Sequence, residues 1–509
     1  MQRYYFRVSV YSHYFKLDRI SIEGMNIINI FIKPFIQYGM VRQPGGRFQY
    51  MAVKAFAASN KTRTEFRLHI NALDDFYRLL SNKQITKDLY QLEEYQIPVY
   101  EKLDLDIKEG WKLKDYQEPV VSYLKQDNNR SLFVPLQTGK GKTICALWAI
   151  SELNMRTIII VKPGYIEKWV EDITKTLQAS IEDIVCVQGT KQLQALLELA
   201  ENDLLDQKFI IISNRTMQLW IKSYEQFGDE TKELGFAFTP DLLYEKVKAG
   251  IRLIDEVHQD FHLNFKLDLY TNVDRTMSLS ATLMSHDPFM ERMYEVVHPT
   301  NTRYDSGPLD RYIESHAILY RLDDSTRVRT TEYGSNNYSH MAFEKSILKN
   351  PYLKERYWKL IDSYIEKYYI NTKKDKEKLA IFASTIDMCT FITNKVKYKY
   401  HYLDVRRSVE DDPYENLIDS DIRITTILSG GTAHDIPNLK TTILTIAIDS
   451  LQSNVQTLGR LRRLENSVPI FIYFTCLDIP KHVEYHNRKK KLLAQRASSY
   501  KEEYAYLRL

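Results

Sequence analysis

The sequence predicts an α/β fold with two parallel-sheet domains in tandem, preceded by a small α+β domain. The chain has 509 residues, which suggests roughly three domains, and 44% of them are hydrophobic, enough for several cores. Short apolar runs alternate with helical stretches in two regions, a pattern typical of parallel sheets covered by helices. The runs are 157–161, 208–212 and 251–254, then 378–382, 422–428, 442–446 and 468–474.

Residues 1–107 form the predicted α+β domain. Residues 46–56 and 62–70 alternate as strands do, with a loop at 57–61, and 71–82 reads as an amphipathic helix capped by Asn71. Basic side chains are mixed with aromatic ones, which suits contact with nucleic-acid phosphates and bases, although a sheet with core aromatics is the alternative. These are Arg42, Arg47, Lys54, Lys61, Arg63, Arg67, Phe48, Tyr50 and Phe66. The apolar stretch 25–36 is too short to span a bilayer and is predicted to be core.

The segment Leu136-Gln-Thr-Gly-Lys-Gly-Lys-Thr143 has the composition of a phosphate-binding loop. It follows the apolar run 131–135 and precedes the helical stretch 144–153. Gly139 and Gly141 allow a tight turn that points N–H groups at phosphate oxygens. Lys142 can then reach the β and γ phosphates of ATP, and Thr143 can ligate Mg²⁺. A flexible strand-to-helix turn is the alternative for this segment alone.

Two adjacent acids follow the apolar run 251–254, at the expected carboxyl end of a buried strand. In nucleotide hydrolases the first, here Asp255, holds the Mg²⁺ shell, and the second, here Glu256, orients and deprotonates the attacking water. Such a pair alone is commonly a solvated turn. Ser280 and Thr282 lie in a small-hydroxyl turn, Ser278-Leu-Ser-Ala-Thr282.

Two further segments complete the set. Gln456-Thr-Leu-Gly-Arg-Leu-Arg-Arg463 places Arg460 and Arg463 about one helical turn apart, where both could face one phosphate. Gln117, roughly twenty residues before the phosphate loop, carries an amide that can recognise adenine through its paired donor and acceptor.

With these segments in this order, the chain resembles the superfamily 2 helicases and translocases, in their DExH branch, over about residues 108–488. In layout it is most similar to the phage UvsW-type DNA helicases. The resemblance implies two RecA-like domains, an ATP-binding one at 108–300 and a second at 301–509 with a basic tail. It assigns ATP contacts to Gln117, Gly139, Gly141, Lys142 and Thr143; Mg²⁺ to Thr143 and Asp255; catalysis to Glu256, Asp255, Gln456 and the arginine fingers Arg460 and Arg463; and coupling to His258, Ser280 and Thr282.

Contacts with nucleic acid are expected in loops. Lys162 and Arg215 follow strands of the first sheet, where ligands of open α/β sheets bind. Ser384, Thr385 and Thr432 lie where the family holds the phosphate backbone. The basic tail 481–491 either extends this track or is a solvated helix end. The polar region from about 300 to 350 is expected to hold an insertion or a flexible linker.

Composition excludes several classes of protein. The formal charge of +4 and the pI near 8.5 do not by themselves indicate nucleic acid. Four cysteines lie far apart without zinc-site spacing, which favours a reduced cytoplasmic protein. The first residues lack the apolar core of a signal peptide, and no membrane association is expected.

The predicted function is an ATP-dependent DNA helicase or translocase that remodels forks, Holliday junctions and displaced-strand loops in replication, recombination and repair. DNA, duplex or branched, is the expected partner, with RNA as the alternative; no protein partner is indicated. A nucleotide-gated clamp without translocation is a third possibility, against which the complete set of Glu256, Arg460 and Arg463 argues.

Overall fold

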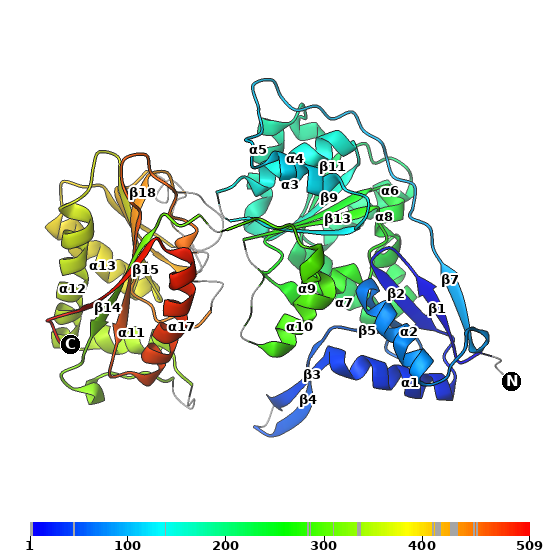
Figure 1. Ribbon diagram of the computed structural model, residues 1–509, viewed down its shortest axis with the longest axis horizontal. Helices are drawn as coiled ribbons and strands as arrows, with labels where there is room; N and C mark the ends of the chain where they lie inside the picture. Colours follow the sequence, from blue (N-terminus) through cyan, green and yellow to red (C-terminus); the bar gives the residue numbers. More distant parts are fainter. Residues whose placement is uncertain are drawn as a thin grey trace. The chain divides into compact units, whose positions relative to one another are not determined.

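The computed structural model describes most of the chain. The described residues are 4–43, 46–137, 139–281, 283, 285, 287–308, 310–332, 337–409, 412, 419–427, 436–450, 454 and 457–509. Two compact units are present: residues 1–136 with 140–306, and residues 137–139 with 307–509 (Figure 1). In the described part of the chain, no helix has the length and apolarity needed to cross a membrane.

The first unit begins with a mixed sheet of five described strands in the order β5-β6-β2-β1-β7, where β1 pairs antiparallel with β2 and parallel with β7. A separate two-stranded ribbon, β3–β4, follows α1. The elements are β1 (Phe6–Val10), β2 (Tyr14–Asp18), α1 (Ile22–Ile32), β3 (Ile36–Arg42), β4 (Phe48–Ala55), β5 (Ala58–Ser59), β6 (Phe66–His69), α2 (Leu73–Asn82) and β7 (Tyr90–Glu94).

The rest of the first unit is a sheet whose six described strands, in the order β10-β11-β9-β12-β13-β8, are all parallel. Its central strands are fully buried runs of β-branched residues, because helices cover both faces, with α3 and α4 on one and α7 and α9 on the other (Figure 1). The elements are α3 (Glu118–Lys125), β8 (Ser131–Pro135), α4 (Lys142–Leu153), β9 (Thr157–Val161), α5 (Ile166–Thr176), β10 (Ile184–Val187), α6 (Thr190–Glu201), β11 (Phe209–Ser213), α7 (Asn214–Phe227), α8 (Leu243–Lys246), β12 (Ile251–Asp255), α9 (Phe261–Asp268), β13 (Arg275–Ser280) and α10 (Pro288–Val297).

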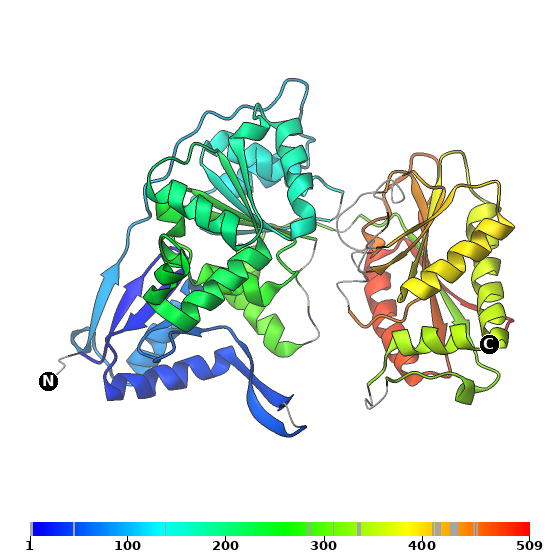
Figure 2. The ribbon, with the colours of Figure 1, turned by 180° about the vertical axis from the view of Figure 1, so that it is seen from behind.

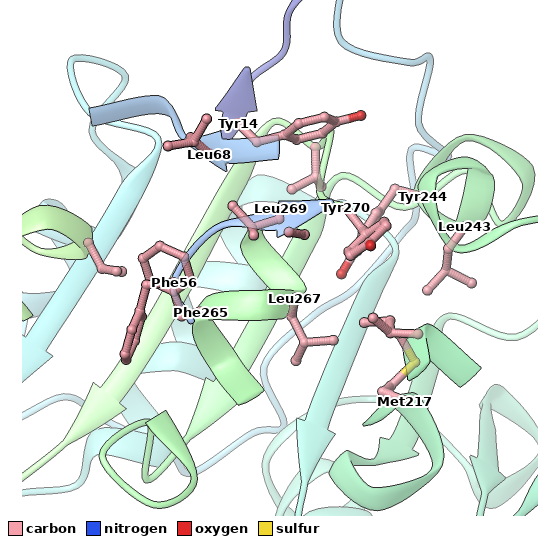
Figure 3. Packing of buried hydrophobic residues seen from close by; sticks show 14 of the residues in the cluster. Tyr14, Phe56, Leu68, Met217, Leu243, Tyr244, Phe265, Leu267, Leu269 and Tyr270 are labelled. Atoms are coloured by element: carbon pink, nitrogen blue, oxygen red, sulfur yellow. The ribbon is translucent and has the colours of Figure 1, made fainter. Parts of the chain in front are cut away.

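One hydrophobic core joins the amino-terminal elements to this parallel sheet. Figure 3 shows Phe56 against Phe265 of α9, and Tyr14 and Leu68 beside Leu269 and Tyr270. The ring of Phe56 lies 4.7 Å from that of Phe265 in an edge-to-face arrangement.

A buried polar cluster lies at the same junction. Arg252 of β12 is paired with Asp268, and His69 approaches this carboxylate at 3.6 Å. Burial lowers the pKa of His13 and of His298 to about 3, so both imidazoles are neutral. The ring of His298 is stacked on Phe133 at 4.8 Å.

The second unit contains a parallel sheet whose seven described strands follow the order β16-β17-β15-β18-β19-β14-β20. Helices α12 and α13 cover one face and α17 the other (Figure 2). The elements are β14 (Glu314–Tyr320), α11 (His340–Lys349), α12 (Pro351–Ile365), β15 (Lys378–Ala383), α13 (Ile386–Lys399), β16 (Val405–Ser408), β17 (Ile422–Thr426), β18 (Leu439–Leu444), β19 (Ile470–Cys476), α17 (Pro480–Arg496) and β20 (Ser499–Tyr504).

The predicted fold class is confirmed, because both units contain parallel sheets covered by helices and the chain begins with an α+β region. Two local expectations were wrong. Region 301–350 is neither insertion nor linker, since β14 is an inner strand of the second sheet and α11 packs on α12. Asn71 does not cap the helix, because a 3-10 turn, Ile70–Ala72, precedes α2 and the Asn71 side chain donates to the carbonyl of Val296.

Candidate active site

The phosphate loop joins β8 to α4, and its last glycine is sterically required. Gly141 is the N-cap of α4 and has φ +80°, a left-handed conformation that disfavours other residues. A Cβ at this position would lie 2.3 Å from the side-chain nitrogen of Gln117. Gly139 also has a positive φ, +87°, whereas Thr138, which precedes it, lies outside the described residues. The two glycines therefore have the backbone conformations expected of a phosphate cradle.

Gln117 contacts this loop directly. Its Nε2 donates to the carbonyl oxygen of Lys140 at 3.1 Å, and its Oε1 accepts from the N–H of Lys114 at 3.0 Å. Because the amide is buried and engaged at both ends, its orientation is fixed. Gln117, the predicted adenine contact, therefore also stabilises the conformation of the phosphate loop.

Lys142 points back toward the start of its own loop. It is buried at the first position of α4, and its Nζ donates to the carbonyl oxygen of Leu136 at 3.2 Å. The same Nζ lies 4.0 Å from Oε1 of Glu256. Thr143, one residue later in α4, is half-buried. The N-terminus of α4, the ammonium group and the acidic strand end thus meet at one edge of the sheet, where the helix dipole favours anions.

Asp255 is the last residue of β12. Its Oδ2 accepts from Nε1 of Trp169 at 3.2 Å, a partner on α5 that the sequence patterns did not indicate. Burial raises the pKa of Asp255 to about 6, the neighbouring charge of Glu256 adds to this, and Lys142 opposes it. Glu256 leaves the strand with φ +51°, which turns its side chain toward Lys142. Two carboxylates in different environments are therefore available for metal binding and for proton transfer.

His258 links this acidic end to the next strand. Its Nδ1 lies 2.5 Å from Oγ of Ser280, the buried last residue of β13, and 3.2 Å from Oε2 of Glu256. Burial lowers the pKa of His258 to about 3, and the charges of Lys142 and Lys162 add to this. The imidazole is therefore neutral, and its contact with Glu256 is not an ion pair. Thr282 lies outside the described residues.

Lys162 and Arg215, predicted to contact nucleic acid, follow β9 and β11 at the same sheet edge. Lys162 Nζ lies 3.7 Å from a carboxylate oxygen of Asp260, which also accepts from the amide of Asn214 at 3.1 Å. Arg215 is exposed in the first turn of α7. Lys162 therefore lies in a polar rim around Asp260, with the exposed Arg215 on the neighbouring helix.

The arginines of the second unit do not lie on the helix that their spacing predicted. Residues 459–464 are not helical, so Arg460 and Arg463 do not lie one helical turn apart. Arg460 is buried, whereas the Arg463 side chain is 68% exposed and donates to Oδ1 of Asp310 at 2.7 Å. Gln456 lies outside the described residues.

A carboxylate that sequence reasoning missed occupies the predicted phosphate contacts of Ser384 and Thr385. Glu344 of α11 is fully buried and accepts from the N–H groups of Ser384 (2.7 Å) and Thr385 (2.8 Å) and from the Thr385 hydroxyl (2.7 Å). Burial raises the pKa of Glu344 to about 7 against these hydrogen bonds. Its sequence signal was a charge on the apolar face of a helix, beside Phe343 and three residues before Ile347. Thr432 lies outside the described residues.

The basic tail is the helix α17, and one of its faces is not solvated. His482, His486 and Lys489 are buried on it, and Lys489 Nζ lies 4.5 Å from the centre of the Tyr473 ring. Burial lowers the pKa of Lys489 to about 7. Its role as a phosphate contact therefore loses support, because the ammonium group is inside the unit.

The donor set suits Mg²⁺ in the presence of nucleotide phosphates. Mg²⁺ prefers oxygen ligands and commonly takes one or two from protein and the rest from phosphate and water. The Thr143 hydroxyl, at the start of α4, and the Asp255 carboxylate, at the end of β12, supply oxygen ligands of this kind. Both lie near Lys142, whose ammonium group would bind the same phosphates as the ion.

Part of the chain is similar to a known protein family. Residues 89–284 match the family model described as Type III restriction enzyme, res subunit. No curated protein matches the chain. Among solved structures, Saccharomyces cerevisiae Dbp5 bound to RNA and ADP BeF3 has 13% identity over 78% of this chain and 91% of that one, with a TM-score of 0.47. Bacteriophage T4 UvsW has 12% identity over 98% and 99%, with a TM-score of 0.33.

The family match spans the phosphate loop and the acidic strand end described above. The match covers less than half of the chain and contains Lys142, Asp255 and Glu256.

Proposed function

We propose that this protein is an ATP-hydrolysing helicase or translocase that moves along DNA and remodels branched DNA, including forks, Holliday junctions and displaced-strand loops, during replication, recombination and repair. The observation that carries the proposal is the position of His258, which contacts both the predicted catalytic base Glu256 and Ser280. A residue placed between the site of hydrolysis and the next strand can transmit a change at one to the other. A motor needs such a link, whereas a simple ATP-binding protein does not.

Each residue has a defined part in the proposed hydrolysis. The N–H groups at the start of α4 and the ammonium group of Lys142 bind the phosphates, and Gln117 contacts the base. Glu256 orients water and accepts its proton. Arg460 and Arg463 stabilise charge on the transferred phosphoryl group.

Thr143 and Asp255 are the residues that would hold Mg²⁺. When bound, the ion neutralises charge on the β and γ phosphates. Asp255 is held for this role by Trp169, whose indole N–H donates to one carboxylate oxygen. Glu256 remains separate from that function because its side chain is turned toward Lys142 and His258.

DNA is favoured as the polymer by the resemblance to phage UvsW-type helicases, which rests on a small basic and aromatic amino-terminal region before two α/β units. Lys162, Arg215 and Ser384 are the proposed phosphate contacts. We expect Thr385 to act through the shape of its loop, because Glu344 engages both its N–H and its hydroxyl. Opening and closing of the motor domains during the ATPase cycle would move the protein along the DNA.

The test is the ATPase rate with single-stranded DNA, duplex DNA, a four-way junction and matched RNA, each across a salt series. Strong stimulation by duplex or branched DNA is expected. Stimulation by RNA alone, with sensitivity to removal of 2′-OH groups, would instead favour an RNA helicase. Slow ATPase with tight binding and no strand displacement would favour a nucleotide-gated clamp.

A further inference from the structure

The β3–β4 ribbon exposes an unusual number of large apolar side chains. The two antiparallel strands extend from the end of α1 away from the five-stranded sheet (Figure 1 and Figure 2). Tyr38 is 46% exposed, Met40 62%, Phe48 64% and Tyr50 67%. Since apolar side chains exposed together on a soluble protein commonly mark an interaction site, the ribbon needs a functional explanation.

The strand register places these four side chains on one face. Tyr38 pairs with Ala52, Met40 with Tyr50 and Arg42 with Phe48, and cross-strand partners share a face. Tyr38 and Tyr50 are stacked, with ring centres 5.7 Å apart and an angle of 21° between planes. We call this the aromatic face. The opposite face carries Met51 across from Gly39.

The charge of the ribbon suits a polyanion. Residues 36–55 include Arg42 and Arg47 and contain no Asp or Glu, while a third cation, Lys54, lies at the base of the ribbon 3.7 Å from a carboxylate oxygen of Asp287. Aromatic rings and a guanidinium group on a positively charged ribbon are the side chains on which nucleic-acid bases stack.

The base of the ribbon is fixed to the ATP-binding part of the same unit. Phe56, which directly follows β4, is buried against Phe265 of α9, and the carbonyl oxygen of Ala55 lies 2.7 Å from Nε2 of His262. The carboxylate of Asp287 caps α10 through Phe289 N–H and accepts from Gln37 at 3.2 Å on β3.

These two helices follow the candidate active-site segments. Helix α9 begins three residues after His258, and α10 follows the segment that begins at Ser280. The ribbon is therefore held by the elements that lead directly out of the site of ATP hydrolysis, and a displacement of those elements would carry the ribbon with it.

We infer that the aromatic face of the β3–β4 ribbon stacks on the terminal base pair, or on the first unpaired base, at the point where the two strands of a branched nucleic acid divide. The inference rests on the proposed function, because it assumes that nucleic acid is the substrate. It adds the place where the strands separate and the residues, Phe48 and Tyr50, that contact the bases.

The test is the fluorescence of 2-aminopurine placed at the junction base of a forked duplex, measured without ATP. Stacking on an aromatic side chain changes this signal. We expect wild-type protein to change it and the Phe48→Ala/Tyr50→Ala variant to lose the change, with affinity for the fork falling roughly tenfold or more. Phe48→Tyr keeps a ring and should retain the signal.

Met51→Ala is the matched control, because it removes a similar side chain from the opposite face of the same ribbon. It should bind the fork as wild type does. Thermal unfolding of all variants shows whether the ribbon still folds. A double variant that folds and gives the wild-type signal would overturn the inference.

If the aromatic face binds something other than nucleic acid, the results will differ. If the double variant loses binding to vesicles of anionic phospholipid or loses self-association in sedimentation, but still engages the fork, the aromatic face binds a membrane or a second copy instead. If wild-type ATPase is not stimulated by any nucleic acid, the proposed function fails; stimulated ATPase with an unchanged double variant refutes only the ribbon.

Discussion

Gly141→Ala should weaken ATP binding through backbone strain and through the loss of one hydrogen bond. A residue other than glycine at φ +80° costs roughly 1–2 kcal/mol. The new Cβ would lie 2.3 Å from Nε2 of Gln117, so the amide must move and its bond to the Lys140 carbonyl is lost, at roughly 0.5–1.5 kcal/mol. Together these amount to roughly 1.5–3.5 kcal/mol, or about 10- to 400-fold in affinity.

The assay is titration of purified protein with a fluorescent ATP analogue, with Mg²⁺ present. Gly164→Ala is a suitable control, since a Cβ there meets no atom within 4 Å. Gly189→Ala adds a second one: its φ of +101° imposes backbone strain without a clash, so it should lower the melting temperature and leave ATP affinity unchanged. Affinity of Gly141→Ala within about threefold of wild type would refute the reasoning.

Three other substitutions test separate parts of the molecule. Glu256→Gln should keep ATP affinity but stop turnover, and normal hydrolysis by this variant would contradict its role as the base. Arg463→Ala should lower turnover by roughly 10³ or more with little change in ATP affinity, measured by single-turnover hydrolysis, and an equal loss of both would argue against a finger. His298→Phe should keep the stacking on Phe133 and make stability less dependent on pH. The folded-state pKa of His298, about 3, lies below the unfolded value near 6.5, so the unfolded state takes up the proton first and stability falls as pH drops below 6.5. Between pH 7 and pH 5 the free energy of unfolding, measured in urea, should fall by about 2 kcal/mol less in the variant than in the wild type. Parallel pH curves for the two proteins would contradict this.

Sequence patterns predicted the elements that depend on residues close to one another in the sequence. The buried strands β9 and β11 are short runs rich in isoleucine, β12 is a short strand that is buried up to Asp255, and the phosphate loop has glycines where the backbone needs a positive φ. Lys142, Glu256 and His258 meet because parallel strands end at one edge of a sheet, which the order of motifs already implies.

Contacts made by residues distant in sequence could not be predicted in this way. Glu344 lies forty residues before Ser384, whose N–H donates to its carboxylate, and only its place on an apolar helix face marked it as unusual. No sequence pattern marks Trp169 as a partner of Asp255, because its indole N–H donates to a carboxylate 86 residues later in the chain. The spacing of Arg460 and Arg463 suggested a helix, but the segment is not helical and their exposures differ.

The shared core of the first unit makes its amino-terminal elements a folding requirement for the parallel sheet. Removing residues 1–99 would expose Phe265 and leave Arg252 and Asp268 beside water instead of His69. Such a truncation should yield an insoluble or partly unfolded ATPase. For the same reason this amino-terminal region cannot be transplanted as a module onto another motor unless the contacting residues of α9 and β12 are transferred with it.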